Sequence, residues 1–355
     1  MEPDYVCPHS AADAELLAHI LTAVDASVAA FRPSPSLADV GSADAAAAPA
    51  TEIDLVCSGG GLKGYFMVGA REVLERQLKR RNMVVRRYAG ASAGAWCAVF
   101  MASGLSSTDW LRTYTSTAAA MRAESTGHIH AAYREHVWPW LKNALPADAY
   151  ERCSGRCFLS ITVFDPLPRN LIVSSFTSND DLFEAALASS LIPLVTSPGL
   201  GATFRGMRVC DGGLLNNCPT FADGARRQLV VDLGEVRYPM AALVSPCDPC
   251  IEALVLSGAL QMARFLEGRP CSRAIQWVDA AAASRLRGGA DPTARAAAAA
   301  AAAATALLVF GSAARGRRTA RLLRALILVA LVLVYVDRGR ARRLYDAIRE
   351  RRLQS

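Results

Sequence analysis

Ser92 lies in Gly90-Ala-Ser-Ala-Gly94, a G-x-S-x-G pattern that can present a serine hydroxyl as a nucleophile. The two glycines remove side chains where the chain must fold tightly on itself. Upstream, Met83–Ala89 is rich in β-branched residues and predicts a strand, while Ala93–Ala102 downstream predicts a buried helix. A strand, a sharp turn and a helix form a nucleophile elbow, so the pattern indicates attack by Ser92 on an acyl carbonyl.

A glycine-rich turn, Gly59-Gly-Gly-Leu-Lys-Gly64, follows a short apolar strand and precedes an amphipathic helix predicted over Tyr65–Arg81. Backbone N–H groups at a helix N-terminus point outward and carry partial positive charge, which suits an oxyanion. This turn is therefore predicted to form an oxyanion hole for acyl transfer. The candidate oxyanion-hole residues are Gly59, Gly60, Gly61 and Gly64.

The same turn also fits a dinucleotide-binding pattern, and it contains a lysine. Its glycines also match G-x-G-x-x-G, the dinucleotide-binding pattern, which requires an acidic residue about 20 positions later. No Asp or Glu occurs between Arg76 and Thr108, and the serine elbow occurs there instead, so the dinucleotide interpretation is disfavoured. Lys63, within the turn, is equally consistent with a solvated loop residue and with a residue near a lipid phosphate.

Asp211 ends a predicted strand and is followed by Gly212 and Gly213, which allow another loop to approach the carboxylate closely. Asp-Gly is also an ordinary turn signal. Hydrolases with a serine elbow carry their triad in the order Ser, acid, His. All five histidines precede Asp211, so that triad cannot form, and a dyad in which Asp211 accepts the Ser92 proton remains. The histidines are His9, His19, His128, His130 and His136.

Taken together, these motifs resemble the patatin-like phospholipase family, whose members use a Ser–Asp dyad. The matching residues are Gly59–Gly64, Gly90–Gly94 and Asp211–Gly213, with a softer match at Ala188–Pro193. Three further segments resemble the animal adiponutrin branch: Cys157–Phe164, Asn170–Phe176 and Asp181–Leu187. The resemblance covers about residues 53 to 235. It implies a three-layer α/β/α domain with a mainly parallel central sheet, no cofactor, and an acyl ester of a phospholipid or glycerolipid as substrate.

Three functions remain open at this point. The favoured one is a serine lipid acyl hydrolase that forms an acyl-enzyme. An acyltransferase would use the same dyad and pass the acyl group to an alcohol instead of water. A catalytically silent lipid-binding or membrane-remodelling protein is the third, and the presence of both Ser92 and Asp211 argues against it.

The chain is expected to divide into four regions. Residues 1–52 contain a helix with an apolar stripe over Glu15–Phe31 and a Pro- and Ala-rich linker. Residues 53–235 form the catalytic domain and 236–290 a helical extension. Residues 291–355 begin with an Ala-rich stretch, continue into an apolar run that arginines flank, and are expected to form a membrane-anchor region. Within the catalytic domain, residues 105–155 carry three tryptophans and three histidines and are expected to form a partly exposed, lid-like insertion.

No metal or disulfide framework is predicted. His128 and His130 lack a third ligand at a sensible spacing, and Cys247 and Cys250 form a C-x-x-C without a second pair. Ten cysteines occur in the chain, and several lie in predicted core elements, where a small apolar side chain is sufficient. Those expected in the core are Cys57, Cys97 and Cys210.

The net charge of +7 is concentrated in the tail: twelve arginines and three acidic residues over Arg315–Ser355 give +9 there and leave −2 elsewhere. The remainder does not resemble a nucleic-acid-binding protein. The run Ala325–Val336 is apolar on every face, and with Leu322 and Leu323 it extends over Leu322–Val336 if Arg324 snorkels to the headgroups, although a span needs about 20 residues. It favours a membrane anchor, as one tilted span or as a hairpin with Ala296–Ala314, over a packing helix. No secretory signal is recognised at Met1, so we expect a membrane-associated protein with a cytosolic catalytic domain.

Overall fold

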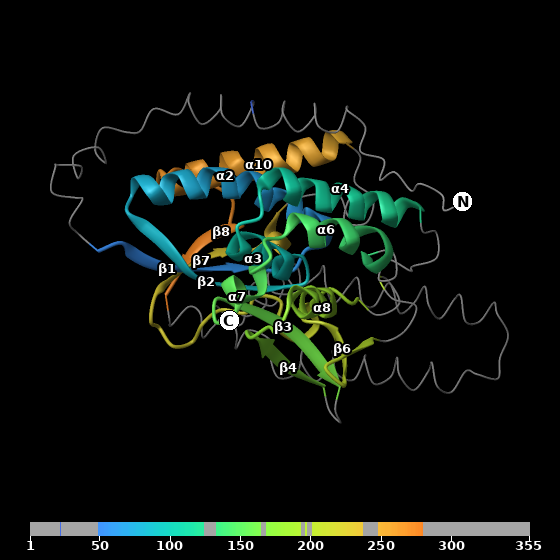
Figure 1. Cartoon of the computed structure of the whole chain (residues 1–355). Helices are drawn as coiled ribbons and strands as arrows, with labels where there is room; N and C mark the ends of the chain where they lie inside the picture. Colours follow the sequence, from blue (N-terminus) through green and yellow to red (C-terminus); the bar gives the residue numbers. More distant parts are fainter. Residues whose placement is uncertain are drawn as a thin grey trace, which may run out of the picture.

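The computed structural model describes residues 49–123, 133–164, 168–192, 201–236 and 248–279, with residues 22 and 196 (Figure 1). Its strands are β1 (Thr51–Cys57), β2 (Met83–Ala91), β3 (Cys157–Phe164), β4 (Pro168–Val173), β5 (Ala202–Phe204), β6 (Met207–Asp211), β7 (Arg227–Val231) and β8 (Ile275–Val278). Its helices are α2 (Tyr65–Arg80), α3 (Ala93–Ser103), α4 (Ser107–Ala123), α6 (Trp138–Ala144), α7 (Ala149–Cys153), α8 (Asn179–Ser189), α9 (Gly213–Asn216) and α10 (Asp248–Leu266). Short turns of 3-10 helix, η3 (Gly61–Gly64) and η5 (Leu233–Glu235), and a π-helical turn, η4 (Tyr133–Val137), complete it.

The strands of this part of the chain form one eight-stranded sheet in the order β5-β6-β3-β2-β1-β7-β8, with β4 paired to β3. The four central strands β3, β2, β1 and β7 are parallel to one another. The outer pairs, β3-β4, β3-β6, β5-β6 and β7-β8, are antiparallel. The sheet is therefore mixed, with the expected parallel arrangement at its centre.

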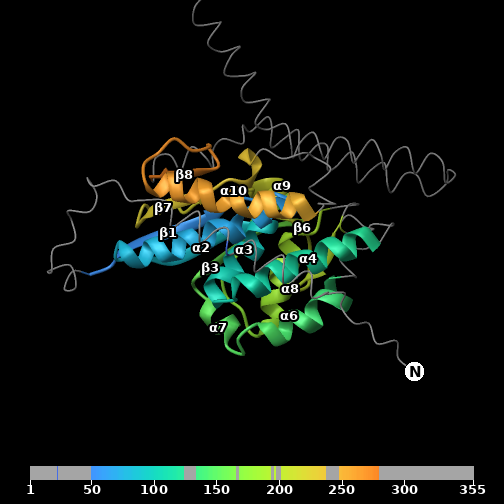
Figure 2. The same ribbon diagram turned by 90° about the horizontal axis from the view of Figure 1, so that it is seen from above.

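One face of this sheet is covered by helices. Alternate residues of β1, Ile53, Leu55 and Cys57, belong to the main hydrophobic core, together with buried side chains of α2, α3, α4, α8 and α10. Figures 1 and 2 show α2 and α10 lying side by side. Their close contact depends on two glycines: a Cβ at Gly69 would lie 1.9 Å from the Val255 carbonyl oxygen, and one at Gly258 would lie 1.9 Å from that of Phe66.

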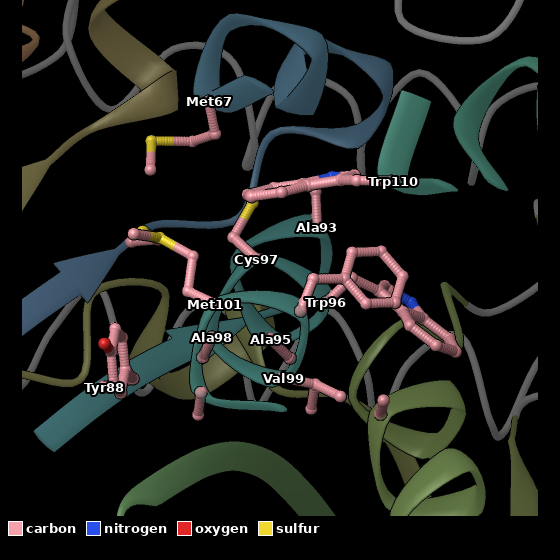
Figure 3. Packing of buried hydrophobic residues seen from close by; sticks show 14 of the residues in the cluster. Met67, Tyr88, Ala93, Ala95, Trp96, Cys97, Ala98, Val99, Met101 and Trp110 are labelled. Carbon is pink, nitrogen blue, oxygen red and sulfur yellow. The ribbon is translucent and has the colours of Figure 1, made fainter. Parts of the chain in front are cut away.

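Helix α3 runs through the centre of this core. All of its residues are buried, so it is apolar on every side and differs from the amphipathic helices around it. Figure 3 shows Trp96, Cys97 and Met101 of α3 packed among other core side chains, including Met67 and Trp110. The end of β2 and the start of α3 are thus held by packing from several elements.

The opposite face of the sheet carries a smaller core. Val56, Ala89, Val230 and Val278 form it with Phe221. Among the described residues, the long helices contribute to the main core, and this smaller core is closed instead by the segment that follows the four-residue helix α9. The described residues therefore show one helical layer on a mixed sheet, whereas the resemblance implied a helical layer on each face.

Two regional expectations are refined by the structure. The segment 236–290, expected as a helical extension, contains α10 but also β8, which pairs with β7 and completes the sheet. In the segment expected as a partly exposed lid, Trp110 is fully buried in the main core, whereas Trp138 and Trp140 are partly buried and pack against it. Apart from residue 22, the helix expected over Glu15–Phe31 lies outside the described residues. His128, His130 and the apolar run Leu322–Val336 lie outside them as well.

Candidate active site

Ser92 stands between β2 and α3, as the strand, turn and helix pattern predicted. Its backbone has φ 54° and ψ −127°, a left-handed conformation that costs a non-glycine residue about 1–3 kcal/mol. The flanking glycines permit this turn, because a Cβ at Gly90 would lie 2.0 Å from the Gly94 carbonyl oxygen. A Cβ at Gly94 would in turn lie 2.2 Å from the carbonyl oxygen of Cys57. The glycine requirements of the elbow are thus explained by close backbone contacts.

The glycine-rich turn after β1 lies directly beside Ser92. A Cβ built on Gly59 would lie 2.9 Å from the Ser92 Cβ. Gly61 has φ 59°, which favours glycine, and begins η3. Gly64 is packed against Tyr114, whose hydroxyl would be 2.4 Å from an added Cβ. The chain therefore brings the predicted oxyanion-hole segment and the predicted nucleophile together.

The backbone amides of the glycine-rich turn differ in their hydrogen-bond partners. The Gly59 N–H donates to Oδ1 and to the carbonyl oxygen of Asn217, each at 3.2 Å, and Nδ2 of Asn217 donates to the Gly59 carbonyl oxygen at 3.3 Å. Gly59 is thus already engaged and does not fit the oxyanion role predicted for its amide. Among the described residues, no hydrogen bond uses the Gly60 or Gly61 amide as a donor.

Asp211 is the last residue of β6 and is 1% exposed. Its Oδ1 accepts a hydrogen bond from the Gly213 N–H at 2.7 Å, and its carbonyl oxygen accepts one from the Thr162 hydroxyl at 2.9 Å. Gly212 passes so close to β3 that a Cβ there would lie 1.8 Å from the Ser160 carbonyl oxygen. The two glycines predicted to support the motif therefore fix the carboxylate and let its loop lie against β3.

The register of β3 links the two predicted dyad residues. Ala91, immediately before Ser92, pairs with Ser160, and Asp211 pairs with the next residue, Ile161. The strand ends that carry Ser92 and Asp211 therefore reach β3 at neighbouring positions. Ser92 is 4% exposed, so the hydroxyl and the carboxylate lie in a region from which most water is excluded.

Ser189, at the end of α8, is a contact residue that the sequence patterns did not single out, although it lies within the softer match Ala188–Pro193. Its hydroxyl accepts a hydrogen bond from the Ser92 N–H at 2.9 Å and donates one to the Ser160 carbonyl oxygen at 2.7 Å. Its carbonyl oxygen accepts from the Gly212 N–H at 3.1 Å. Asn217 was also missed, although it lies six residues after Asp211.

Lys63 is half-buried at the end of the glycine-rich turn. Burial lowers the pKa of its ammonium group, and the nearby carboxylates of Asp232 and Glu235 act in the opposite direction. Asp232 in turn accepts a hydrogen bond from the Ser58 hydroxyl at 2.7 Å. A lipid phosphate would have to compete with these two carboxylates for Lys63.

The cysteines expected in the core are found there as free, buried thiols at Cys57, Cys97 and Cys210. Burial raises the pKa of the Cys210 thiol, and the neighbouring Asp211 adds to the effect. Within the described ranges, no group of three or more His, Cys, Asp or Glu side chains could hold a metal ion. In the same part of the chain, no helix combines the length and the apolar character needed to cross a bilayer.

Comparison with known proteins agrees with this geometry. The family model described as patatin-like phospholipase matches residues 55–222, which include the glycine-rich turn, the elbow and Asp211. Human patatin-like phospholipase domain-containing protein 4 is 30% identical over 175 residues, which cover 48% of this chain and 68% of that protein. The chain belongs to the patatin-like phospholipase family. The predicted family and its α/β fold are thereby confirmed.

Other members of the patatin-like phospholipase family match the same region. Human patatin-like phospholipase domain-containing protein 5 is 35% identical over 172 residues, 48% of this chain and 39% of its own length. Human adiponutrin, named 1-acylglycerol-3-phosphate O-acyltransferase PNPLA3, is 30% identical over 165 residues, 46% of this chain and 34% of its own length. The match thus spans well under half of these two relatives.

Proposed function

We propose that this patatin-like protein is a serine lipid acyl hydrolase that cleaves carboxylic ester bonds of phospholipids or glycerolipids. The observation that carries the proposal is the meeting of three segments around Ser92. The elbow gives Ser92 its strained backbone, and Gly59 lies against the Ser92 Cβ. Asp211 pairs with Ile161 of β3, next to Ser160, the partner of Ala91. These are the parts that acyl transfer requires: a nucleophile, a base and donors for an oxyanion.

In the proposed mechanism, the Ser92 hydroxyl attacks the ester carbonyl carbon while the Asp211 carboxylate accepts its proton. The negative charge that develops on the carbonyl oxygen is stabilised by the amides of Gly60 and Gly61, with the amide of Ala93 at the start of α3, where the first N–H groups lack intrahelical acceptors. Loss of one such donor typically raises a barrier by about 3 kcal/mol.

The tetrahedral intermediate then collapses, and Asp211 returns its proton to the departing alcohol oxygen. An acyl group remains on Ser92 Oγ. A water molecule gives a proton to Asp211 and attacks the acyl carbonyl. In the second collapse the bond from the acyl carbon to Ser92 Oγ breaks, Asp211 returns the proton to Oγ, and a fatty acid is released. The burial of Asp211 supports this role, because little water competes for the proton that the carboxylate must accept.

Acyl transfer to an alcohol is the second candidate, and it uses the same acyl-enzyme. It is favoured by the similarity to human 1-acylglycerol-3-phosphate O-acyltransferase PNPLA3. The two reactions differ only in which hydroxyl compound attacks the acyl-enzyme. A catalytically silent role in lipid binding would leave the strained conformation of Ser92 and the close approach of Gly59 without a use.

We further propose that the protein meets its lipid substrate at a membrane surface through the apolar run Leu322–Val336. This run is bordered by arginines and lies outside the family-like region. Both a single span and a hairpin with Ala296–Ala314 are consistent with the sequence. The catalytic domain would then act on the leaflet that faces the cytosol.

Purified full-length protein, incubated with labelled phospholipids and glycerolipids in the presence and absence of a lysophospholipid or monoacylglycerol acceptor, tests the proposal. The hydrolase predicts release of labelled fatty acid that Ser92→Ala abolishes. Labelled product that appears mainly in the acceptor would favour the acyltransferase. If the folded protein neither releases nor transfers an acyl chain from any of these lipids, the catalytically silent lipid-binding function is favoured instead.

A further inference from the structure

Ser92 occupies a backbone conformation that a serine does not adopt without support. A residue in this region persists only when its surroundings over-determine it. The packing of α3 and the two glycines provide part of that support, but the Ser92 N–H also requires an acceptor, because a buried amide without one is unfavourable. That acceptor is the hydroxyl of Ser189, 2.9 Å away and fully buried.

The orientation of the Ser189 hydroxyl is fixed by its second bond. Its proton is donated to the Ser160 carbonyl oxygen at 2.7 Å, so the remaining lone pairs are the ones that receive the Ser92 N–H. Ser160 is the residue of β3 that pairs with Ala91. One side chain therefore ties the elbow to the strand against which the elbow is registered.

The backbone of Ser189 makes a third connection. Its carbonyl oxygen accepts from the Gly212 N–H at 3.1 Å, and the Leu191 carbonyl oxygen, two residues later, accepts from the Asp211 N–H at 2.8 Å. The end of α8 thus contacts both the residue proposed as nucleophile and the loop that carries the proposed base. Ser189 therefore bonds the backbone of the proposed nucleophile and that of Gly212, the residue after the proposed base.

We propose that Ser189 is a positioning residue that holds the strained Ser92 elbow at the correct distance from Asp211. This inference rests on the proposed function of the Ser92–Asp211 dyad. Removal of the Ser189 hydroxyl would leave the Ser92 N–H without its acceptor and let the elbow relax towards an unstrained conformation. A shift of the nucleophile by about 1 Å typically costs on the order of 10²-fold in rate. Substrate binding, which depends on other surfaces, would change little.

Ser154 provides a matched control within the same protein. Its hydroxyl also accepts from one backbone N–H, that of Phe176 at 3.0 Å, and donates to a carbonyl oxygen, that of Tyr150 at 2.8 Å. It lies directly after α7, and its side chain bonds to Tyr150 and Phe176 and not to Ser92 or Asp211. Its hydroxyl also lies 3.3 Å from the Phe176 carbonyl oxygen as a second possible acceptor. Ser154→Ala thus removes the same two kinds of hydrogen bond and reports what that loss does to stability alone.

The experiment compares full-length wild type, Ser189→Ala and Ser154→Ala. Three quantities are measured for each: Tm, kcat and KM on a short dispersed ester, and the second-order rate constant of labelling by a fluorophosphonate, with the labelled peptide identified by mass spectrometry. We expect both variants to lose thermal stability. Ser189→Ala should also lose about 10- to 100-fold in kcat and in labelling rate with KM nearly unchanged, while Ser154→Ala keeps both rates.

If Ser189→Ala does not fold, Ser189→Cys takes its place, because a thiol has nearly the same size but is a much weaker acceptor. It should lose about tenfold in kcat and labelling rate. Wild-type rates in whichever variant folds, or equal losses in Ser154→Ala, would overturn the positioning role while the dyad stands. A wild-type protein that is not labelled at Ser92 would overturn the proposed function, and the positioning role with it.

Discussion

The N–H of Gly213 donates a hydrogen bond of 2.7 Å to Oδ1 of Asp211. This contact spans only two residues, so it fixes the carboxylate relative to its own loop and not through a distant element. Gly212, between the two residues, must be a glycine because a Cβ there would lie 1.8 Å from the Ser160 carbonyl oxygen of β3. The direction in which Asp211 presents its second oxygen is thereby set by local geometry.

This contact makes Asp211→Asn an informative substitution. An asparagine can accept the same bond from Gly213 through its own Oδ1, so the loop should keep its conformation and the protein its Tm. The amide cannot accept a proton from Ser92, and we expect kcat to fall by at least about 10³-fold. Steady-state hydrolysis of a dispersed ester checks this. More than a tenth of wild-type turnover in a folded Asp211→Asn protein would exclude Asp211 as the base.

Asn217→Ala tests whether the Asn217 side chain holds the glycine-rich turn in place. Loss of its side-chain contacts with both backbone groups of Gly59 should loosen the Gly60 and Gly61 amides, and we expect a fall in kcat of about 10- to 100-fold. Asn179 is the matched control, since it likewise accepts from a backbone N–H, that of Tyr150, and donates to a carbonyl oxygen, that of Pro146. Asn179→Ala should reduce Tm and leave kcat unchanged. Equal kcat values for the two variants would mean that Asn217 has only a structural role.

The phenol of Tyr88 makes the stability of the fold depend on pH, independently of the proposed chemistry. Burial raises the pKa of this phenol from 10.0 to about 12. Because the unfolded chain ionises first, the stability that the neutral phenol contributes is fully present below pH 10 and is lost as the pH rises towards 12. At pH 11 the loss should be about 1.4 kcal/mol.

Tyr88→Phe removes this ionisation and leaves the other groups in place. The free energy of unfolding, measured in urea at pH 9 and pH 11, should therefore fall further in wild type than in the variant. If the two proteins lose the same free energy over this range, the phenol is not protected from ionisation in the folded state.

The C-terminal residues are proposed to attach the protein to a membrane. Deletion of Ala296–Ser355 should give a protein that still hydrolyses short dispersed esters but acts poorly on bilayer lipid, because Leu322–Val336 is proposed as the anchor. In membranes washed with alkaline carbonate, the full-length chain should stay in the pellet and the truncated chain should move to the supernatant. Equal release of both chains would show that the run does not act as an anchor.

The sequence was most informative where contacts are local. The elbow around Ser92 and the strand and helix beside it follow from glycine spacing and short apolar patterns, and the structure confirms them. The contacts that hold the elbow and the glycine-rich turn join residues far apart in the chain: Ser189 is 97 residues from Ser92, and Asn217 is 158 residues from Gly59. No local pattern encodes such pairs, so neither residue could be given a role from the sequence.

The same distinction applies to the fold. The parallel centre of the sheet follows from strands that alternate with helices, but β8 pairs with β7 from a region where only helix was expected. The four residues of β8 are too few to show a clear alternation in a sequence. Residues 105–155 were expected to form a partly exposed insertion, but Trp110 within them packs against Phe100 and Tyr114 and is fully buried.

The central claim is that Ser92 is the nucleophile, and covalent labelling tests it most directly. Full-length wild type and Ser92→Ala are treated with a fluorophosphonate, digested and analysed by mass spectrometry, while hydrolysis of a dispersed ester is followed in parallel. The account predicts one adduct, on the peptide that contains Ser92, with activity lost in proportion to labelling and neither labelling nor turnover in Ser92→Ala. Turnover at the wild-type rate by a folded Ser92→Ala protein would contradict it.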